Sequence, residues 1–299
     1  VHGDNRGWFK ENWQREKLSE AAPELASFQP VQNNISYNRT GATRGLHAEP
    51  WDKLISVAQG KIFGAWCDLR EGSESFGEVI THEIGPETAV FVPRGVANGF
   101  QALEETSYCY LVNEHWSAEA RYAAVNLNIV DWPLEPTEIS EKDKQHPDLA
   151  EVSPMPARRI LVTGANGQLG RALKRLLTDA EFCSHADFDI TDPPERNWKQ
   201  YSAIINCAAY NDVNGAENDR AAAWAVNAEA PARLARIAAE NQLTLVHVSS
   251  DYIFDGANEV HTEAELPSPL SAYGASKAAG DTAVQTAPQH YVIRTSWVF

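Results

Sequence analysis

A strand that runs directly into a glycine-rich turn is the feature that most constrains this chain. Residues 159–162 are mostly apolar and predict a strand, and Gly164, Gly167 and Gly170 follow it, where a helix over 168–177 is expected to begin. Such a turn lets the backbone approach a pyrophosphate, and the free N–H groups of the helix N-terminus bind it. The string alone could equally pack a helix, but the strand–turn–helix context favours a dinucleotide site.

The choice between NAD and NADP depends on the end of the second strand. An acidic residue about 20 positions after the turn would bind the ribose 2′-hydroxyl and select NAD. The expected strand end offers Ser184 and His185, and Asp187 comes a little late. NADP is therefore at least as compatible as NAD, and we favour NADP(H) over NAD(H). Asp189 and Ile190 follow and would line the adenine pocket, although Asp189 could instead cap a turn.

Tyr273 and Lys277 are one helical turn apart at the expected start of a helix. A phenol is a poor acid at neutral pH, and a neighbouring cation lowers its pKa. The phenol can then give a proton to a carbonyl oxygen while hydride reaches the carbon. Ser250, or failing that Ser249, ends the preceding strand and would hold that carbonyl. A Tyr-x-x-x-Lys string by itself is usually a surface helix, but its order after the glycine turn and the serine-ended strand favours the catalytic interpretation.

The second half alternates between strands and helices, which predicts a doubly wound parallel sheet of the Rossmann kind. The expected strands lie at 159–162, 203–207, 243–248 and 291–295, and the expected helices at 168–177, 220–241 and 276–284.

The first half predicts strands alone. Short β-branched or aromatic runs occupy 54–58, 61–69, 88–92 and 107–112, and no long helical period separates them. This pattern is typical of an all-β sandwich or barrel. A proline-rich, charged stretch follows, with some helical potential at 140–146. We therefore expect a barrel at 1–133, a linker at 134–157 and a dinucleotide-binding domain at 158–299.

The composition excludes several classes of partner. The 299 residues carry a net charge of −16, which repels nucleic-acid phosphates and anionic lipids. No run of 18 apolar residues occurs, so we expect no membrane span. The four cysteines are far apart and form no CxxC pair, which indicates free thiols in a reducing cytoplasm and no zinc site.

The second half resembles dTDP-4-dehydrorhamnose reductase, an extended short-chain dehydrogenase/reductase. The resemblance lies in residues 159–170, 206–210, 249–256, 273–277 and 294–297. It implies a domain that continues beyond Phe299. With the glycine turn, it implies cofactor contacts from Gly164, Asn166, Gly167, Gln168, Leu169, Asp189, Ile190, Ala208, Ala209, Tyr210 and Lys277.

In the first half, His47 is the residue with the strongest case for chemistry. A lone histidine is more often structural than catalytic. Here Arg6, Arg44 and Lys53 could bind a diphosphate beside it, and Tyr110 on a later strand could act as an acid opposite a histidine base. No His-x-His pair followed by Glu is present, so we expect no metal in the barrel.

The first half is similar to dTDP-4-dehydrorhamnose 3,5-epimerase, a metal-free cupin-type β-barrel (jelly roll) dimer. The similarity lies in residues 4–11, 44–47, 53–54, 68–73, 76–77 and 91–93. It implies His47 as base, Tyr110 as acid and Lys53 as the group that stabilises the enolate. The residues implied in substrate binding are Arg6, Phe9, Glu11, Gln32, Asn34 and Arg44. The family has a histidine at Asn98 and a late aspartate that orients the base, for which we expect Asp68 or a water to substitute.

Together the two halves predict a cytoplasmic bifunctional enzyme of dTDP-L-rhamnose biosynthesis, homodimeric through the barrel. It would epimerise dTDP-4-keto-6-deoxyglucose at C3 and C5 and then reduce its C4 ketone. Two alternatives stay open. The second half could be another extended reductase or epimerase acting on a nucleotide sugar, or the barrel could be catalytically dead and serve as a dimerisation module.

Overall fold

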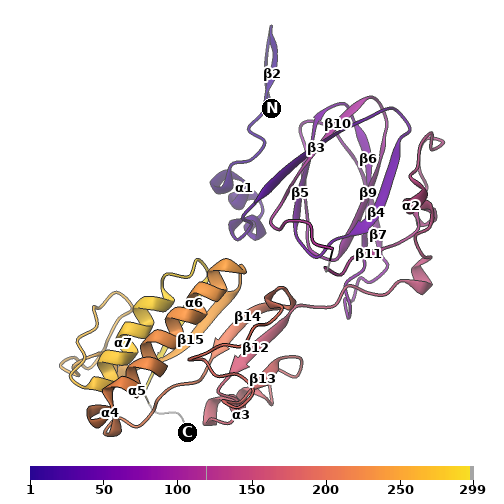
Figure 1. Cartoon of the computed structure of the whole chain (residues 1–299). Coiled ribbons are helices and arrows are strands. Elements are labelled where there is room, and N and C mark those ends of the chain that lie inside the picture. Colours follow the sequence, from indigo (N-terminus) through magenta and orange to yellow (C-terminus); the bar gives the residue numbers. More distant parts are fainter. Residues whose placement is uncertain (119, 297–299) are drawn as a thin grey trace. The chain divides into compact units, whose positions relative to one another are not determined.

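The structure, a computed structural model, describes residues 1–118 and 120–296 and divides into two compact units, Val1–Ala157 and Arg158–Phe299 (Figure 1). Trp297, the last residue of the reductase resemblance, lies outside the described residues. No helix in the described part of the chain is long and apolar enough to cross a membrane.

The first unit is a β-barrel preceded by a hairpin and a short helical region. Its elements are β1 (His2–Asp4), β2 (Gly7–Phe9), α1 (Arg15–Ala21), η1 (Pro23–Ala26), β3 (Gln32–Asn38), β4 (Thr43–Ala48), β5 (Lys53–Gln59), β6 (Ile62–Asp68), β7 (Val79–Ile84), β8 (Ala89–Val92), β9 (Val96–Ala102), β10 (Thr106–Val112), β11 (Ala123–Ala124), η2 (Leu127–Ile129), α2 (Glu141–Lys144) and η3 (Leu149–Glu151).

Two antiparallel sheets form the barrel, in the orders β3-β10-β5-β8 and β11-β4-β9-β6-β7 (Figure 1). Side chains alternate between the faces of a strand, so each sheet turns one set of residues toward the other sheet. Ile55, Val57 and Tyr108 of the first sheet pack with Ile62 and Phe100 of the second in one buried cluster. The predicted all-β jelly-roll domain is confirmed.

Residues 134–157 pack on the barrel and are not a free linker, which corrects our expectation. Met155 and Val152 are buried in the same apolar cluster as Leu46 of β4. The Met155 backbone also hydrogen-bonds Leu69 and Glu71, at 2.7 and 2.8 Å. In the sequence, the prolines and charged residues of this stretch outnumber the few apolar residues that anchor it, and the stretch therefore resembles a linker. The expected helical turn is present as α2, with Ser140 as its N-cap.

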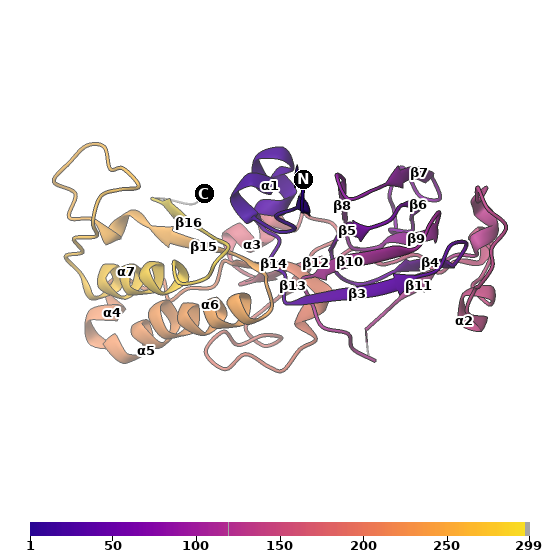
Figure 2. The ribbon, with the colours of Figure 1, turned by 90° about the horizontal axis from the view of Figure 1, so that it is seen from above.

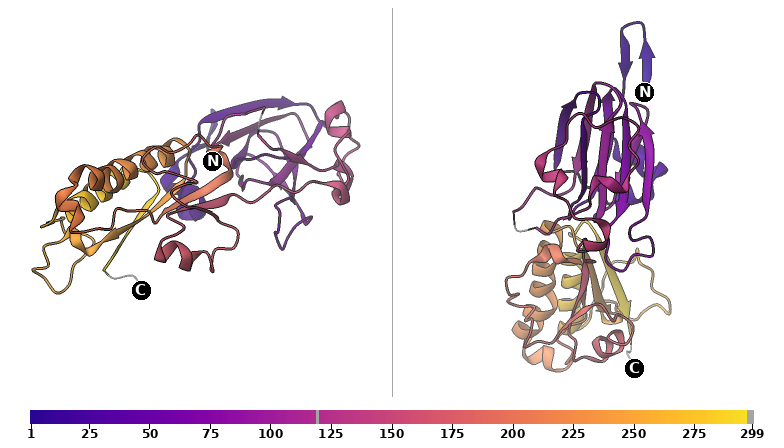
Figure 3. Two further views of the ribbon diagram at one scale, coloured as in Figure 1. Left: turned by 60° about the horizontal axis from the view of Figure 1, so that its bottom comes forward. Right: turned by 90° about the vertical axis from the view of Figure 1, so that its right-hand side faces the viewer.

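The second unit is a five-stranded parallel sheet, with α6 and α7 side by side on one face and α3 on the other (Figure 3). Its elements are β12 (Arg159–Thr163), α3 (Gln168–Leu173), β13 (Glu181–Cys183), η4 (Trp198–Gln200), β14 (Tyr201–Asn206), α4 (Gly215–Asn218), α5 (Arg220–Trp224), η5 (Ala225–Glu229), α6 (Ala230–Glu240), β15 (Thr244–Ser250), η6 (Asp251–Ile253), α7 (Ala272–Val284) and β16 (His290–Thr295).

The strand order β13-β12-β14-β15-β16 reverses direction at β12. Right-handed crossovers then place α3 on the face opposite α6 and α7, as Figure 2 shows from above. The predicted doubly wound parallel sheet is confirmed. Ligands of such sheets bind where the order reverses, at the carboxyl ends of the strands, which here means between β12 and β14.

The helix expected over 220–241 is present with one irregularity. The π-helical turn η5 joins α5 to α6, and Pro231 stands in the first turn of α6. Because proline has no N–H to give to the preceding turn, the regular hydrogen-bond ladder is interrupted there. Asn227 of η5 uses its side chain to bond the Tyr210 backbone and the Ser276 hydroxyl, which ties this helix to the loop after β14 and to α7.

Two candidate active sites

The three glycines of the turn after β12 have different roles. Gly164 has a φ of +71°, and a Cβ there would lie 2.7 Å from the Ala208 nitrogen. A Cβ on Gly170 would lie 2.4 Å from the Gly164 oxygen, so this glycine lets α3 approach the turn. A Cβ on Gly167 would come within 4 Å of one atom, the Gly164 oxygen at 3.2 Å. Gly167 therefore faces open space, where a ligand can approach the backbone.

A cavity of about 360 Å³ lies at the point where the strand order reverses. Its lining brings together residues from the turn after β12, the region after β13 and the loop after β14. The predicted cofactor residues among them are Gly164, Asn166, Gly167, Asp189, Ile190, Ala208, Ala209 and Tyr210. The cavity is therefore shaped by backbone from three loops, as a dinucleotide site requires.

The carboxylates near this cavity already have partners. Asp189 accepts hydrogen bonds from the Thr191 hydroxyl and backbone N–H at 2.7 and 2.8 Å, which lower its pKa. Asp187 accepts from the Ser184 hydroxyl and N–H at 2.6 and 2.9 Å, which lower its pKa as well. Both carboxylates therefore stabilise turns of the protein.

A second cavity of about 610 Å³ adjoins the first and contains the predicted catalytic residues. Ser250 at the end of β15 and Tyr273 and Lys277 on α7 all line it, together with Gln168 and Leu169 of α3. Ser271 caps α7 by accepting a hydrogen bond from the Gly274 N–H at 3.0 Å. This cap starts the helix at Ala272, earlier than the sequence suggested, and fixes the first turn that carries Tyr273.

The tyrosine and the lysine contact different partners. Burial raises the pKa of Tyr273, and a hydrogen bond with Ser250 partly offsets it. The Lys277 Nζ instead donates to the Val248 carbonyl at 2.8 Å and lies 3.5 Å from His247 Nε2. The contacts described for the Lys277 amino group do not include Tyr273, and the expected lowering of the tyrosine pKa by the lysine stays a prediction.

In the barrel, His47 forms a dyad with an aspartate that the sequence did not reveal. Its Nε2 lies 2.8 Å from Asp143 Oδ1, and the other carboxylate oxygen accepts from the Gly45 N–H at 3.2 Å. Burial opposes ionisation of Asp143, but the hydrogen bonds from His47 and Gly45 outweigh it and lower its pKa. Asp68 is not the partner of His47, since it binds Arg70, Ser73 and Ser75. The dyad leaves Nδ1 of His47 as the ring atom with a free lone pair.

Lys53 and Tyr110 lie on the opposite sheet from His47 and face the same interior. Lys53 is buried, with its amino group bonded to Glu49 and, at 3.0 Å, to Asn98 Oδ1. Burial lowers its pKa, and the Glu49 carboxylate works against that change. The same amino group lies 5.3 Å from the centre of the Tyr110 ring, whose hydroxyl pKa burial raises.

Two adjoining cavities, of about 760 and 470 Å³, open on this group, and both are lined by His47, Glu49 and Tyr110. The larger also contains the predicted substrate residues Gln32 and Asn34, and the smaller contains Arg44 and Lys53. Together they bring six of the predicted barrel residues to one interior.

Arg6, Phe9 and Glu11 are not part of this interior. They belong to the hairpin β1–β2 and its continuation, whose strands pair with each other in the described chain and with no barrel strand. Phe9 is 64% exposed, Arg6 pairs with Asp4, and Glu11 pairs with Lys17. Within a single chain, the structure therefore separates these three residues from His47.

Two further residues escaped the sequence analysis because they contact the site from distant segments. Glu49 pairs with Lys53, and His146 packs edge-on against His47 with ring centroids 5.0 Å apart. Side-chain atoms of His47, Asp143 and His146 lie within 4.8 Å of one another, an arrangement that a metal ion could occupy. The short His47–Asp143 contact already satisfies both of those atoms, and a metal-free barrel stays a prediction.

Comparison with known proteins gives a match for each unit. Residues 1–151 match the model of the dTDP-4-dehydrorhamnose 3,5-epimerase family, and residues 158–299 match that of the RmlD substrate binding domain. An RmlC homolog of Streptococcus pyogenes is 52% identical over 166 residues, which cover 52% of this chain and 84% of that protein. RmlC from Streptococcus suis, solved in complex with dTDP-D-xylose, is 49% identical over 52% of this chain and 86% of its own, with a TM-score of 0.48.

For the second unit, a dTDP-4-dehydrorhamnose reductase of Mycobacterium tuberculosis is 41% identical over 155 residues. The match covers 48% of this chain and 51% of the reductase, so the chain spans about half of the length of that relative. The second unit is thus similar to part of the dTDP-4-dehydrorhamnose reductases, and through its barrel the chain belongs to the dTDP-4-dehydrorhamnose 3,5-epimerase family.

Proposed function

We propose that the barrel epimerises a dTDP-4-keto-6-deoxy sugar at the two carbons that flank its ketone. The observation that carries this proposal is the His47–Asp143 pair in an interior that also holds Lys53 and Tyr110. Asp143 fixes the proton on Nε2, which leaves Nδ1 to remove the proton beside the ketone. The Lys53 ammonium stabilises the enolate oxygen, and Tyr110 returns a proton to the opposite face of the carbon.

We further propose that the second unit reduces the C4 ketone of the product. The support is the gathering of Ser250, Tyr273 and Lys277 around one cavity beside the glycine turn. Ser250 hydrogen-bonds the ketone oxygen, and Tyr273 gives that oxygen its proton. A bound NADPH supplies the hydride. The open space at Gly167 and the exposed N-terminus of α3 fit its pyrophosphate.

NADP(H) is the proposed cofactor, with NAD(H) as the alternative. The end of β13 presents Ser184 and His185, and His185 lines the cavity where the adenosine would lie. The nearest carboxylate in sequence, Asp187, is engaged with Ser184. A carboxylate free to accept a hydrogen bond from the ribose 2′-hydroxyl would favour NAD instead.

The barrel is proposed to form a homodimer in which each hairpin serves the partner's cavity. The similarity to the epimerases assigns Arg6, Phe9 and Glu11 to the substrate, yet their own barrel does not bring them to it. Trp8 and Phe9 leave large apolar surfaces exposed on the hairpin. In a two-fold dimer each copy gives the other the same segment. The hairpin of one copy can therefore bring Arg6, Phe9 and Glu11 to the cavity of its partner.

The cofactor proposal is tested by two glycine variants. Gly167→Val places a side chain in the open space of the turn, so we expect a folded protein whose NADPH affinity falls at least about tenfold. Gly170→Ala drives a Cβ into the Gly164 oxygen, so it should lower the melting temperature as well. Calorimetric titration with NADPH and thermal melts measure both. Unchanged NADPH affinity in Gly167→Val would show that the turn only packs α3.

The epimerase proposal is tested by proton exchange at the sugar C3 and C5 in heavy water. His47→Asn should abolish the exchange, and Asp143→Asn should slow it by roughly 10²–10⁴-fold because the ring loses its fixed tautomer. Asp68→Asn is the matched control, since Asp68 binds Arg70 and two serines away from His47. Exchange that survives both dyad variants, or that Asp68→Asn slows more than Asp143→Asn, would remove His47 from the chemistry.

The dimer proposal is tested by complementation. A His47→Asn chain and an Arg6→Ala chain should each be inactive in exchange alone. Co-expressed, they form mixed dimers in which one site combines an intact His47 with the partner's Arg6, and we expect roughly a quarter of the parent activity. Sedimentation checks the dimer itself. No recovery of exchange in confirmed mixed dimers would mean that each hairpin serves its own barrel or none.

The reductase proposal is tested by Tyr273→Phe in a protein that carries the complete reductase domain. The change keeps the ring and removes the hydroxyl, so NADPH binding and stability should persist while reduction of the keto sugar falls by roughly 10²–10⁴-fold. Lys277→Met should lose activity and also bind NADPH more weakly. Tyr291→Phe, on an exposed tyrosine of β16, is the control. A Tyr273→Phe protein that reduces the sugar at the parent rate would show that the motif is only a helix start.

A further inference from the structure

We propose that Asp281 is a positioning residue of the reductase site, a buried counter-charge that keeps the Lys277 amino group protonated across the N–H of His247. The inference rests on the proposed reductase function, because it assigns a role toward the lysine of that site. The side chains concerned are His247, Asp281 and Arg294, which lie next to Lys277 and are not part of the Tyr-x-x-x-Lys motif.

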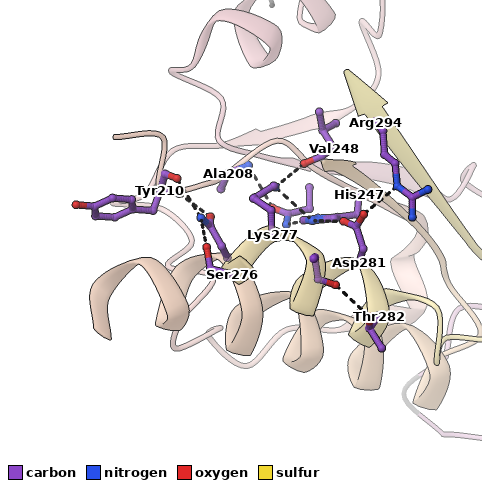
Figure 4. Close-up of polar contacts among 12 residues, drawn as sticks. Ala208, Tyr210, His247, Val248, Ser276, Lys277, Asp281, Thr282 and Arg294 are labelled. Carbon is purple, nitrogen blue, oxygen red and sulfur yellow. Dashed lines mark hydrogen bonds and ion pairs between the residues drawn. The ribbon is translucent and has the colours of Figure 1, made fainter. Parts of the chain in front are cut away.

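Three elements bring these side chains together (Figure 4). Lys277 of α7 is 1% exposed, and Asp281 lies one turn further along the same helix with an equally buried carboxylate. His247 of β15 places its Nε2 3.5 Å from the Lys277 Nζ and 4.0 Å from Asp281 Oδ1. Arg294 of β16 donates from Nε to the other carboxylate oxygen at 3.1 Å.

The neighbouring strand fixes the tautomer of His247. The Ala208 backbone N–H donates to Asn206 Oδ1 at 3.2 Å, and the Thr163 hydroxyl donates to the same oxygen at 2.7 Å. The Asn206 amide nitrogen must therefore face His247 Nδ1, at 3.0 Å, and donate to it. An imidazole that accepts at Nδ1 carries its proton on Nε2, so an N–H points toward Lys277 and Asp281.

The Nε2–H of His247 lies between the Lys277 ammonium and the Asp281 carboxylate. The charge of Lys277 therefore depends on whether Asp281 is ionised. A ring N–H beside an ammonium group is unfavourable, whereas the same N–H beside a carboxylate is favourable. His247 stays neutral, because burial and the nearby lysine lower its pKa to about 3. Burial also lowers the pKa of Lys277, to about 8, and Asp281 is the group that works against this loss.

Asp281 itself is held between two opposing influences. Burial raises its pKa, and contacts with Ser249, Arg294 and Lys277 work in the other direction. Arg294 contacts Oδ2 of the carboxylate, and the other oxygen, Oδ1, is the one that lies 4.0 Å from His247 Nε2.

Other titratable groups near Lys277 come from α7, α3 and the segments that follow β14 and β15. Tyr273 precedes it on α7, Cys207 follows β14, and burial raises the pKa of that thiol to about 11. Asp251 and Tyr252 follow β15, and Arg171 of α3 lines the far side of the cavity. Burial lowers the pKa of Lys277, and the charge of Asp281 raises it.

The test measures the charge of Lys277 directly, in the ligand-free full chain, by NMR titration with lysine labelled at Cε. A Lys277→Met protein identifies the signal. Asp281→Asn keeps the shape and the acceptor for Arg294 but removes the charge. Its Lys277 midpoint should fall by roughly one pH unit, about tenfold in the protonation constant. The alkaline limb of the NADPH-dependent reduction should move to lower pH with it.

Arg294→Gln provides the opposite change and a second route if Asp281→Asn does not fold. It removes the positive charge that competes for Asp281, so the Lys277 midpoint should rise. Thr282→Val is the control, because the Thr282 hydroxyl binds the Ala278 carbonyl of the same helix. Its midpoint should match the parent.

The outcomes separate the two proposals. If Asp281→Asn melts earlier while its Lys277 midpoint equals that of the parent, Asp281 is structural and the inference is overturned. A midpoint that Arg294→Gln leaves unchanged or lowers overturns it as well. If the complete protein reduces no keto sugar, the reductase proposal fails, and the midpoints still decide whether Asp281 controls the charge of Lys277.

Discussion

A buried charged group needs a partner, because the interior of a protein does not solvate it as water does. Both units place the side chains of their candidate sites under this constraint. In the barrel, Lys53 has Glu49 and His47 has Asp143. In the second unit, Lys277 has Asp281 across His247. Each candidate cation or base thus has a carboxylate beside it, and in the barrel these carboxylates, Glu49 and Asp143, line the same cavity as Lys53 and His47.

These partners also explain why particular backbone segments lie where they do. Asp143 can reach His47 because residues 134–157 fold back on the barrel, anchored by Met155 and Val152. Asp281 can reach His247 because α7 packs along β15 and β16. The apolar contacts therefore position the segments, and the charged groups use that position. A change in the packing of either segment would displace Asp143 or Asp281 in its site before it disrupted the fold.

The sequence predicted what depends on neighbours along the chain. The glycine turn and the pair Tyr273–Lys277 are local patterns, and each falls on the expected strand end or helix start. The pairing of His47 with Asp143 is not local, since 96 positions separate them. Nothing in the spacing of residues 134–157 distinguishes a linker from a segment whose few apolar residues are buried. The sequence therefore gives no reason to place Asp143 beside His47, and Asp68 is the partner that it suggests.

The position of the hairpin β1–β2 is also a non-local property, which in the proposed dimer involves a second copy of the chain. Strands β1 and β2 pair with each other, and no barrel strand of the described chain pairs with them. A sequence similarity can assign Arg6 to a substrate without saying which copy of the barrel holds that substrate.

The chemistry of the proposed functions gives the two units a necessary order. Protons at C3 and C5 are acidic because the C4 ketone can accept the charge as an enolate. Reduction converts that ketone into an alcohol and removes the acidity. The barrel must therefore act first, and any sugar that the reductase reaches too early can no longer be epimerised. A chain that carries both units supplies them in equal amounts, so the rate of the second step relative to the first is fixed by their sites. In the proposed scheme the buried carboxylates Asp143 and Asp281 would act on those two steps separately, one on the base of the epimerase and one on the lysine of the reductase.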